Sequence, residues 1–141
     1  MQNYILDACA LLAFFAEEKG ADVVSELLSR AEQKEIYLCI NAINLIEVYY
    51  DRIRVEGADK ADAIIRGVYD TFPVTILENN TPAIVREAAR LKAKGRMSFA
   101  DAILVATAHC IDATIVTCDH VELEHIEKEG NIPFFWIRTK F

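Results

Sequence analysis

Short apolar segments, rich in β-branched and aromatic residues, alternate along this chain with longer segments of helical periodicity. The predicted strands are residues 4–6, 36–40, 74–77, 114–117 and 134–137. The predicted helices are residues 8–18, 21–34, 44–56, 60–69, 82–94, 98–111 and 121–129. Strands that are apolar throughout and separated by helices are typical of a parallel sheet covered on both faces. We therefore predict an α/β fold, with a short-stranded parallel sheet as the middle layer of a three-layer α/β/α arrangement.

The length and composition of the chain fit one domain over residues 1–141. Hydrophobic residues make up 53% of the sequence, which excludes a disordered chain. No apolar segment approaches the roughly 18–20 residues that a membrane-spanning helix needs. The N-terminus lacks the basic region of a signal peptide, and Asp7 interrupts its apolar run. We expect a cytoplasmic protein with no membrane association.

The charge balance limits the kinds of partner that the chain can bind. It has 22 acidic and 15 basic residues, for a net charge of −7. Non-specific nucleic-acid binding depends on clustered Lys and Arg, so this balance argues against a broad phosphate-binding surface. A local basic patch stays compatible with it, as does a metal ion that turns an acidic pocket into a phosphate site.

Four cysteines are spread along the chain, namely Cys9, Cys39, Cys110 and Cys118. They form no C-x-x-C pair, and each has apolar neighbours in the sequence. A free cysteine in such surroundings usually packs as a small hydrophobic residue. We expect four reduced, buried thiols.

Four carboxylates stand alone in segments that are otherwise free of charged side chains, if histidine is counted as neutral. The four are Asp7, Glu47, Asp101 and Asp119. The segments around them are residues 1–16, 36–50, 97–111 and 113–121. A carboxylate in an apolar segment is costly to bury unless its charge is compensated. No Lys or Arg lies in these segments, so the compensation must come from elsewhere in the fold or from a bound cation.

The positions of the four carboxylates favour their convergence. Asp7 and Asp119 follow predicted strands, while Glu47 and Asp101 lie in the first turns of predicted helices. In parallel α/β folds, ligands bind beyond the carboxyl ends of the strands. Acidic side chains gathered there would repel one another and raise each other's pKa values in the absence of a cation. Mg²⁺ or Mn²⁺, which prefer oxygen ligands, would relieve that repulsion.

Helix capping is the alternative explanation for the same residues. Carboxylates near helix N-termini are stabilised by the helix dipole, and all four lie near such ends. The sequence from Ser98 to Asp101 fits the capping-box pattern, and Asn44 stands three residues before Glu47 in a looser version of it. Asp7 and Asp119 are themselves suitable N-cap residues. Capping does not explain why all four lie in segments free of other charges, so we favour a metal site.

With these residues, the sequence resembles the PIN-domain ribonucleases, specifically the VapC-type toxins of toxin–antitoxin pairs. The matching motifs are YILDA at 4–8, NLIEV at 44–48, SFADA at 98–102 and TIVTCDH at 114–120. Their order and spacing agree with the family over essentially the whole chain. The sequence departs from the family at Cys9, where relatives often have Ser or Asn, and at Leu123, where an aromatic residue is common.

The resemblance implies Mg²⁺- or Mn²⁺-dependent hydrolysis of RNA phosphodiester bonds. It implies that the four carboxylates are both catalytic residues and metal ligands, with Asp7 and Asp101 as the most direct ligands. Glu47 would orient or deprotonate the attacking water, and Asp119 would complete the cage or a second metal site. Ser98 and Thr117 match supporting hydroxyl positions. The resemblance also implies a cognate antitoxin and a homodimer as partners.

A local basic patch precedes the third of these motifs. Its residues are Arg86, Arg90, Lys92, Lys94 and Arg96. Three of them repeat every four residues on one predicted helix face, and the run leads directly into the segment that begins at Ser98. We interpret Arg86, Arg90, Lys94 and Arg96 as candidates for binding the phosphates of a nucleic acid. An ordinary solvated helix face is the alternative, and Arg52 and Arg54 are a weaker second set of candidates.

Two other kinds of protein remain compatible with the sequence. One is a non-catalytic binding domain of the same fold. The other is a different α/β carboxylate protein, such as a receiver domain or an aspartyl-phosphate phosphatase. A receiver would need paired acids near the N-terminus, and the phosphatase would need Asp-x-Asp where this chain has Asp7-Ala8-Cys9. The isolated acids themselves argue against a domain that is free of catalysis.

Overall fold

The computed structural model describes residues 1–140, in which strands and helices alternate as the apolar pattern predicts. The strands are β1 (Gln2–Leu6), β2 (Ile36–Asn41), β3 (Thr75–Leu77), β4 (Thr114–Thr117) and β5 (Phe134–Trp136). The helices are α1 (Ala8–Phe15), α2 (Ala21–Glu32), α3 (Ala42–Glu56), α4 (Ala58–Asp70), α5 (Pro82–Ala93), α6 (Phe99–Ile111) and α7 (His120–Lys128). No helix among the described residues is long and apolar enough to cross a membrane.

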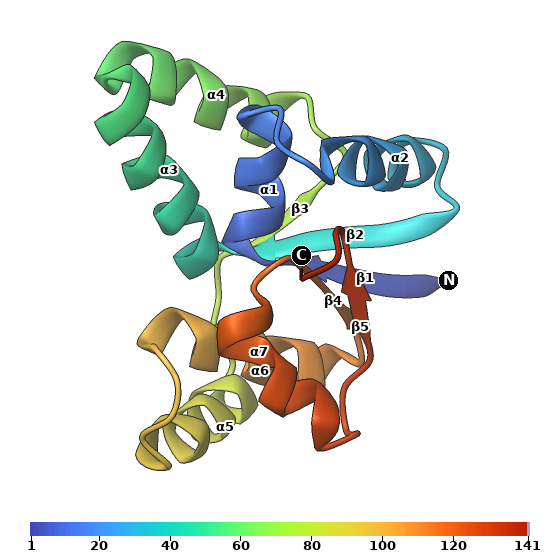
Figure 1. Ribbon diagram of the computed structural model, residues 1–141, viewed down its shortest axis with the longest axis vertical. Coiled ribbons are helices and arrows are strands. Elements are labelled where there is room, and N and C mark those ends of the chain that lie inside the picture. The colour runs from blue at the N-terminus through green and yellow to red at the C-terminus, as the bar shows by residue number, and fades with distance from the viewer. Residues whose placement is uncertain (141) are drawn as a thin grey trace.

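The five strands form one parallel sheet in the order β3-β2-β1-β4-β5. Helices cover both faces of this sheet, with α1 and α2 on one face and α6 on the other (Figure 1). The predicted three-layer α/β/α fold is therefore confirmed. Because β1 lies at the centre, between β2 and β4, the residue that follows β1 lies in the middle of the carboxyl edge of the sheet.

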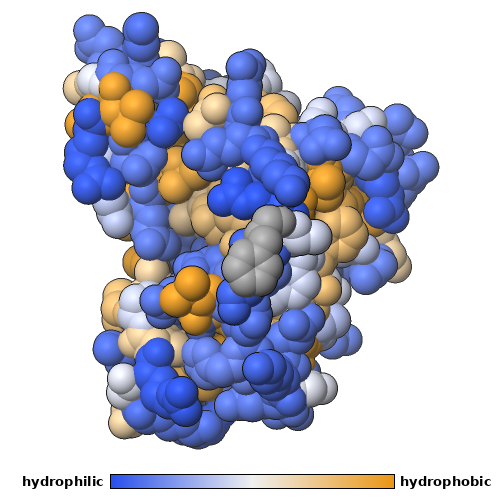
Figure 2. All heavy atoms as spheres, in the orientation of Figure 1, coloured by the Kyte–Doolittle hydropathy of each residue, from blue (hydrophilic) through white to orange (hydrophobic). Residues whose placement is uncertain are grey.

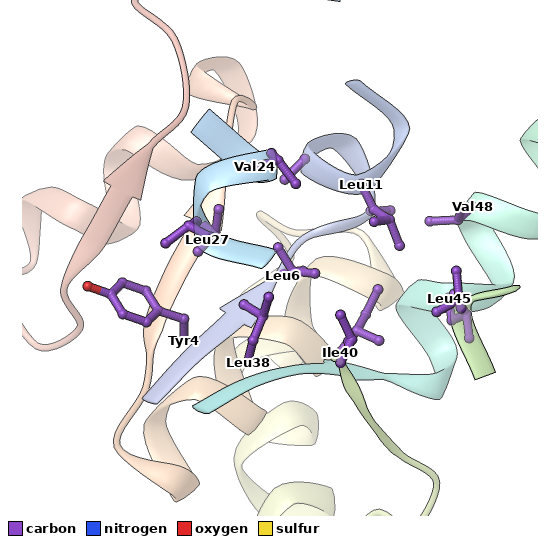
Figure 3. Close-up of a cluster of buried hydrophobic side chains, with 14 of the residues drawn as sticks. Tyr4, Leu6, Leu11, Val24, Leu27, Leu38, Ile40, Leu45 and Val48 are labelled. Carbon is purple, nitrogen blue, oxygen red and sulfur yellow. The ribbon is translucent and has the colours of Figure 1, made fainter. Parts of the chain in front are cut away.

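Alternate residues of the central strand supply two separate hydrophobic cores. Tyr4 and Leu6 pack into the cluster between the sheet and helices α1 to α4, which Figure 3 shows. Ile5 points to the opposite face and packs against α5 and α6, where Leu104 is fully buried. This alternation is the two-residue period of a strand that is buried on both faces. The two cores hold the helices that follow the strands in place at the carboxyl edge.

Hydrogen-bonding side chains at the helix N-termini account for where several helices begin. Thr81 accepts a hydrogen bond from the Ile84 amide at the start of α5, where Pro82 is the first helical residue, as predicted. The α3 helix begins two residues earlier than predicted, because Asn41 is its N-cap and accepts from the Ile43 amide at 2.9 Å. Asn44 is therefore not a cap residue, and Glu47 lies in the second helical turn rather than the first.

The cysteines follow the prediction only in part. All four are free thiols, and Cys39 is buried against α5 and α6. Cys9 and Cys118 are half-buried, and Cys110 is exposed near the end of α6. The expectation that all four are buried is wrong. The buried part of α6 ends at Ala108, and Cys110 lies beyond it, next to the exposed His109 in the last turn of the helix.

Candidate active site

A pocket of about 370 Å³ lies at the carboxyl edge of the sheet and is lined by residues of α1, α3, α6 and α7 and of the segments that precede α1, α6 and α7. Six carboxylates line it, together with polar, aromatic and cationic side chains from α1 and α3 and from the start of α6. The lining residues are Asp7, Ala8, Cys9, Leu12, Glu47, Tyr50, Asp51, Arg54, Ser98, Asp101, Asp119 and Glu122. All four carboxylates that stand alone in the sequence therefore lie around one pocket.

Asp7 lies at the N-cap position of α1 directly after β1, and it is 3% exposed. Its carboxylate makes no capping hydrogen bond, so capping does not account for this residue. Oδ2 instead accepts a hydrogen bond from the Thr117 hydroxyl at 2.8 Å. Burial raises the pKa of Asp7 well above its usual value, and the charges of Cys9 and Asp101 add to that increase.

The Thr117 hydroxyl connects the ends of β1 and β4. It donates to Asp7 Oδ2 and accepts from the Asp119 amide at 3.0 Å. The Cys9 thiol lies beside it, 3.3 Å from Asp7 Oδ2, and its sulfur accepts from the Cys118 amide at 3.2 Å. This network holds the Asp7 carboxylate against the loop that carries Asp119. Cys9 thus occupies a supporting position, where the resemblance predicts Ser or Asn.

Asp101 lies in the first turn of α6 and is 8% exposed. The Ser98 hydroxyl caps this helix by accepting a hydrogen bond from the Asp101 amide at 3.1 Å. Burial, which is the largest cause, raises the pKa of the Asp101 carboxyl to about 6. The Ser98 hydroxyl, acting on the Asp101 carboxyl itself, opposes this increase in the pKa. The charges of Asp119, Glu47 and Glu122 raise the pKa further.

Glu47 is half-buried on α3, and Asn44 lies one turn before it. The Asn44 side chain is fully buried and donates to the Ala100 carbonyl at 3.1 Å and to Glu47 Oε1 at 3.4 Å. It therefore connects α3 to the first turn of α6. Burial raises the pKa of Glu47, and the charge of Asp119 adds to the increase.

Asp119 does act as a helix cap, because its Oδ1 accepts a hydrogen bond from the Glu122 amide at 3.1 Å at the start of α7. The capping interpretation is thus correct for this residue and wrong for Asp7. Capping and a place in the pocket are compatible, because Asp119 also lines the pocket and raises the pKa values of Glu47 and Asp101. The acids of the pocket therefore affect one another electrostatically.

The donor set suits a hard divalent cation by its chemistry. Carboxylate oxygens surround the pocket, and burial together with mutual repulsion disfavours their ionised forms. Within residues 1–140, however, no three His, Cys, Asp or Glu side chains are grouped closely enough to hold a metal ion as they stand. Mg²⁺ commonly keeps several waters and takes only one or two carboxylates directly. The residues present therefore fit a partly hydrated Mg²⁺ better than an ion held in an all-protein cage.

Four lining residues are charged or aromatic groups that the sequence did not single out as part of the acidic cluster. They are Tyr50, Asp51, Arg54 and Glu122. Asp51 lies one helical turn after Glu47, and Glu122 lies three residues after Asp119. This spacing puts each on the same helix face as a predicted acid. Charge-rich neighbouring sequence concealed Asp51, because isolation from other charges was the feature that identified the four acids. Arg54 was expected only as a weaker candidate for binding phosphate.

The predicted phosphate-binding patch does not line this pocket. Arg86 and Arg90 line a different hollow on α5, together with Glu87, His109 and Cys110. Arg90 forms an ion pair with Glu87. Lys94 and Arg96 are exposed in the segment between α5 and α6. Any contact of this basic face with a nucleic acid stays a prediction.

We expect the free energy of unfolding of the metal-free protein to fall as the pH rises from 3.8 to about 6. These are the ordinary and folded-state pKa values of Asp101, and between them the folded protein binds the proton more tightly than the unfolded chain. Asp101→Asn should reduce this pH dependence. Urea denaturation in EDTA at a series of pH values measures it. If wild type instead became more stable than Asp101→Asn as the pH rises over this range, the electrostatic description would be contradicted.

A Mg²⁺ ion held by Asp7 would bind about 10- to 100-fold more weakly in Thr117→Val, because hydrogen-bonding partners behind metal ligands typically contribute that much. Valine keeps the size of Thr117 but removes the donor to Asp7 Oδ2 and the acceptor for the Asp119 amide. Calorimetric titration with Mg²⁺ measures the affinity. Thr71→Val is the control, because the Thr71 hydroxyl donates to the Gly67 carbonyl at the exposed end of α4, outside the pocket. Equal Mg²⁺ affinity in wild type and Thr117→Val would exclude the supporting role.

Residues 4–129 match the family model for the PIN domain. Comparison with curated protein sequences gives no match. Among solved structures, the chain is similar to VapBC2 from Rickettsia felis bound to a promoter DNA fragment, with a TM-score of 0.70 and 16% identity over 96% of this chain and 98% of that one. It is similar to DNA-bound VapBC from Salmonella typhimurium, with a TM-score of 0.69 and 19% identity over 98% and 100% of the two chains. VapBC-1 from nontypeable Haemophilus influenzae gives a TM-score of 0.69 and 17% identity over 96% and 98%. At these identities the similarity demonstrates a shared fold.

Proposed function

This chain belongs to the PIN domain family, and from that premise we propose that its acidic pocket is the active site of a divalent-metal-dependent endoribonuclease. The main support is Asp7, a nearly fully buried carboxylate with neither a capping role nor a cationic partner in any hydrogen bond or ion pair found among residues 1–140. Three other acids from distant parts of the chain line the same pocket. A buried charge without a partner is costly, and a bound cation would offset that cost.

In this proposal Asp7 and Asp101 hold the ion directly, and Thr117 and Ser98 keep those two residues in position. A bound Mg²⁺ or Mn²⁺ neutralises charge on the phosphate and makes a bound water more acidic. Glu47, which lines the same pocket, would orient the attacking water or accept its proton. Asp119, which is half-buried, completes the ligand set through water or at a second metal position.

The test is cleavage of a fluorescently labelled single-stranded RNA in Mg²⁺, in Mn²⁺ and in EDTA, with DNA of the same sequence as the comparison. We expect RNA cleavage with either metal, none in EDTA, and recovery when Mg²⁺ is added back. Cleavage that persists in EDTA would reject the metal-dependent mechanism. RNA binding without cleavage under every condition would favour a non-catalytic binding domain. Family membership argues against a receiver or a phosphatase.

We further propose that the protein is the toxin of a toxin–antitoxin module in the cytoplasm and binds a cognate antitoxin and a second copy of itself. The similar structures include three of VapBC, and another is a toxin–antitoxin complex from Klebsiella pneumoniae. An apolar hollow of about 360 Å³ between α5 and α6, with Val85 and Phe99 exposed, is the kind of surface that a protein partner covers.

Inducible expression in a bacterium tests the toxin proposal, and light scattering of the purified chain tests the homodimer. Wild-type protein should arrest growth, whereas Asp7→Asn protein at the same level should not. Growth arrest by both proteins would mean that the toxicity does not depend on the carboxylate of Asp7, and it would contradict the proposal that the acidic pocket causes the arrest. A monomeric mass at all concentrations would reject the homodimer.

A further inference from the structure

A polyanionic substrate meets an electrostatic obstacle at this pocket. Six of the twelve lining residues are acidic, and RNA carries a negative charge at every phosphate. Within the described lining, the only cationic side chain is that of Arg54. A bound metal ion would offset the repulsion between the acidic side chains and the phosphate that is cleaved. The nucleotides on either side of that phosphate need contacts with other side chains. Arg54 is the residue in a position to make one.

Arg54 lies one helical turn after Tyr50 on α3, and the two side chains contact each other. The guanidinium carbon of Arg54 is 5.2 Å from the centre of the Tyr50 ring, within the range of a cation–π interaction. Arg54 Nη2 is also 3.3 Å from Asp51 Oδ1. Tyr50 is 48% exposed, and the Arg54 side chain is 69% exposed. The pair thus forms an exposed edge of the acidic pocket, which we call the Tyr50–Arg54 edge.

The neighbouring arginine on α3 has a different environment. Arg52 is 7% exposed and forms ion pairs with Asp51 at 3.0 Å and Glu56 at 3.4 Å. It is therefore held inside the structure and does not line the pocket. The arginines of α5 line a separate hollow. Of Arg52 and Arg54, which form the weaker second set of candidates in the sequence, only Arg54 can reach a substrate in the pocket.

We propose that the Tyr50–Arg54 edge binds the nucleotide next to the cleaved bond, with an unpaired RNA base stacking on Tyr50 and a phosphate bound by Arg54. The proposal rests on the function proposed above and names the side chains that contact the RNA beside the cleaved bond. Aromatic rings and guanidinium planes are common stacking surfaces for unpaired bases. An arginine fork binds phosphate oxygens in two hydrogen bonds, and this phosphate would compete with Asp51 for Arg54.

Steady-state cleavage of single-stranded RNA in Mg²⁺ tests the catalytic consequence. Tyr50→Ala should raise KM about tenfold, the size of effect expected when one stacking contact is lost, with little change in kcat. Tyr50→Phe keeps the ring and should behave like wild type. Arg54→Ala should raise KM. It should also lower the slope of log KM against log salt concentration by about one, because one phosphate contact is lost. Arg54→Lys should retain most of that slope.

A binding experiment makes the test independent of turnover. Single-stranded RNA containing 2-aminopurine is titrated with the Asp7→Asn protein, which should not cleave it. Stacking on Tyr50 should quench the fluorescence of the probe at one position, and a second substitution, Tyr50→Ala, should restore it. Double-stranded RNA of the same sequence should bind more weakly, because its bases are already stacked.

The α4 helix supplies matched controls for both residues. Tyr69 is 51% exposed, and Arg66 pairs with Asp62 much as Arg54 pairs with Asp51. Tyr69→Ala and Arg66→Ala should leave KM and quenching unchanged. Wild-type cleavage with unchanged KM in Tyr50→Ala and Arg54→Ala would overturn this inference and leave the proposed function intact. If these two variants cleaved RNA with unchanged KM but no longer bound a protein partner, the Tyr50–Arg54 edge would be assigned to that partner instead. Failure of wild-type protein to cleave RNA would reject the proposed function itself.

Discussion

Asp7→Asn is expected to lower RNA cleavage by at least about a hundredfold, since the proposed mechanism makes Asp7 a metal ligand and such a ligand controls several kcal/mol of transition-state stabilisation. The same substitution should raise the thermal stability of the metal-free protein. Asp7 is 3% exposed, and burial disfavours its charged form. Asparagine is nearly the same size, is neutral, and can still accept the hydrogen bond from Thr117. Loss of activity together with a gain in stability is the signature of a residue kept for chemistry.

Initial cleavage rates and thermal melts in EDTA measure the two effects. Asp59→Asn is the matched control, because Asp59 is an exposed aspartate in the first turn of α4. It should leave both cleavage and melting temperature nearly unchanged. Full activity in Asp7→Asn would remove the central residue from the proposed mechanism. A lower melting temperature would indicate that the fold needs this carboxylate for structural reasons.

Leu104→Ala is expected to lower the free energy of unfolding by about 3 kcal/mol, within the range measured for buried leucines. Leu104 is fully buried on α6, in the core that contains Ile5 of the central strand. The substitution removes apolar contacts and leaves a cavity beneath the helix that carries Asp101. It should therefore reduce stability, whereas Asp7→Asn should increase it.

Urea denaturation measures the effect of Leu104→Ala, and Val55→Ala provides the comparison because Val55 is 64% exposed on α3. The exposed valine should contribute only a few tenths of a kcal/mol, on the order of ±0.5 for a surface position. A Leu104→Ala protein as stable as wild type would mean that the core collapses around the missing side chain. It would contradict the close packing that positions α6.

The strands and the overall fold could be predicted from the sequence because their signals are local. The predicted strand 114–117 coincides with β4, and the other strands differ from prediction only at their ends. The helix ends also differ from the prediction. The predicted helix 8–18 ends at Phe15, after which Glu17 adopts a left-handed backbone conformation. Apolar periodicity alone does not reveal such a turn, because the turn depends on how the chain continues towards α2.

The two aspartates that fit the N-cap pattern, Asp7 and Asp119, show what a single sequence motif can and cannot predict. Asp7 and Asp119 both fit the pattern of an N-cap, yet only Asp119 makes the capping hydrogen bond. The difference comes from Thr117, which lies 110 residues away from Asp7 in the sequence and donates to its carboxylate. A local motif does not determine the hydrogen-bond partner of a side chain when one possible partner is distant in the sequence and comes close only in the folded protein.

By itself, the sequence determined the type of sheet, the two-sided burial of the strands and the identity of the four isolated acids. Each of these follows from hydrophobic period or from the cost of placing charge among apolar residues, which are properties of short segments. Only the tertiary structure decided that Tyr50 and Arg54 border the acidic pocket and that Arg86 does not. The physical reason is that the face a helix turns towards a site is set by its packing against the sheet and other helices, through contacts between residues far apart in the chain.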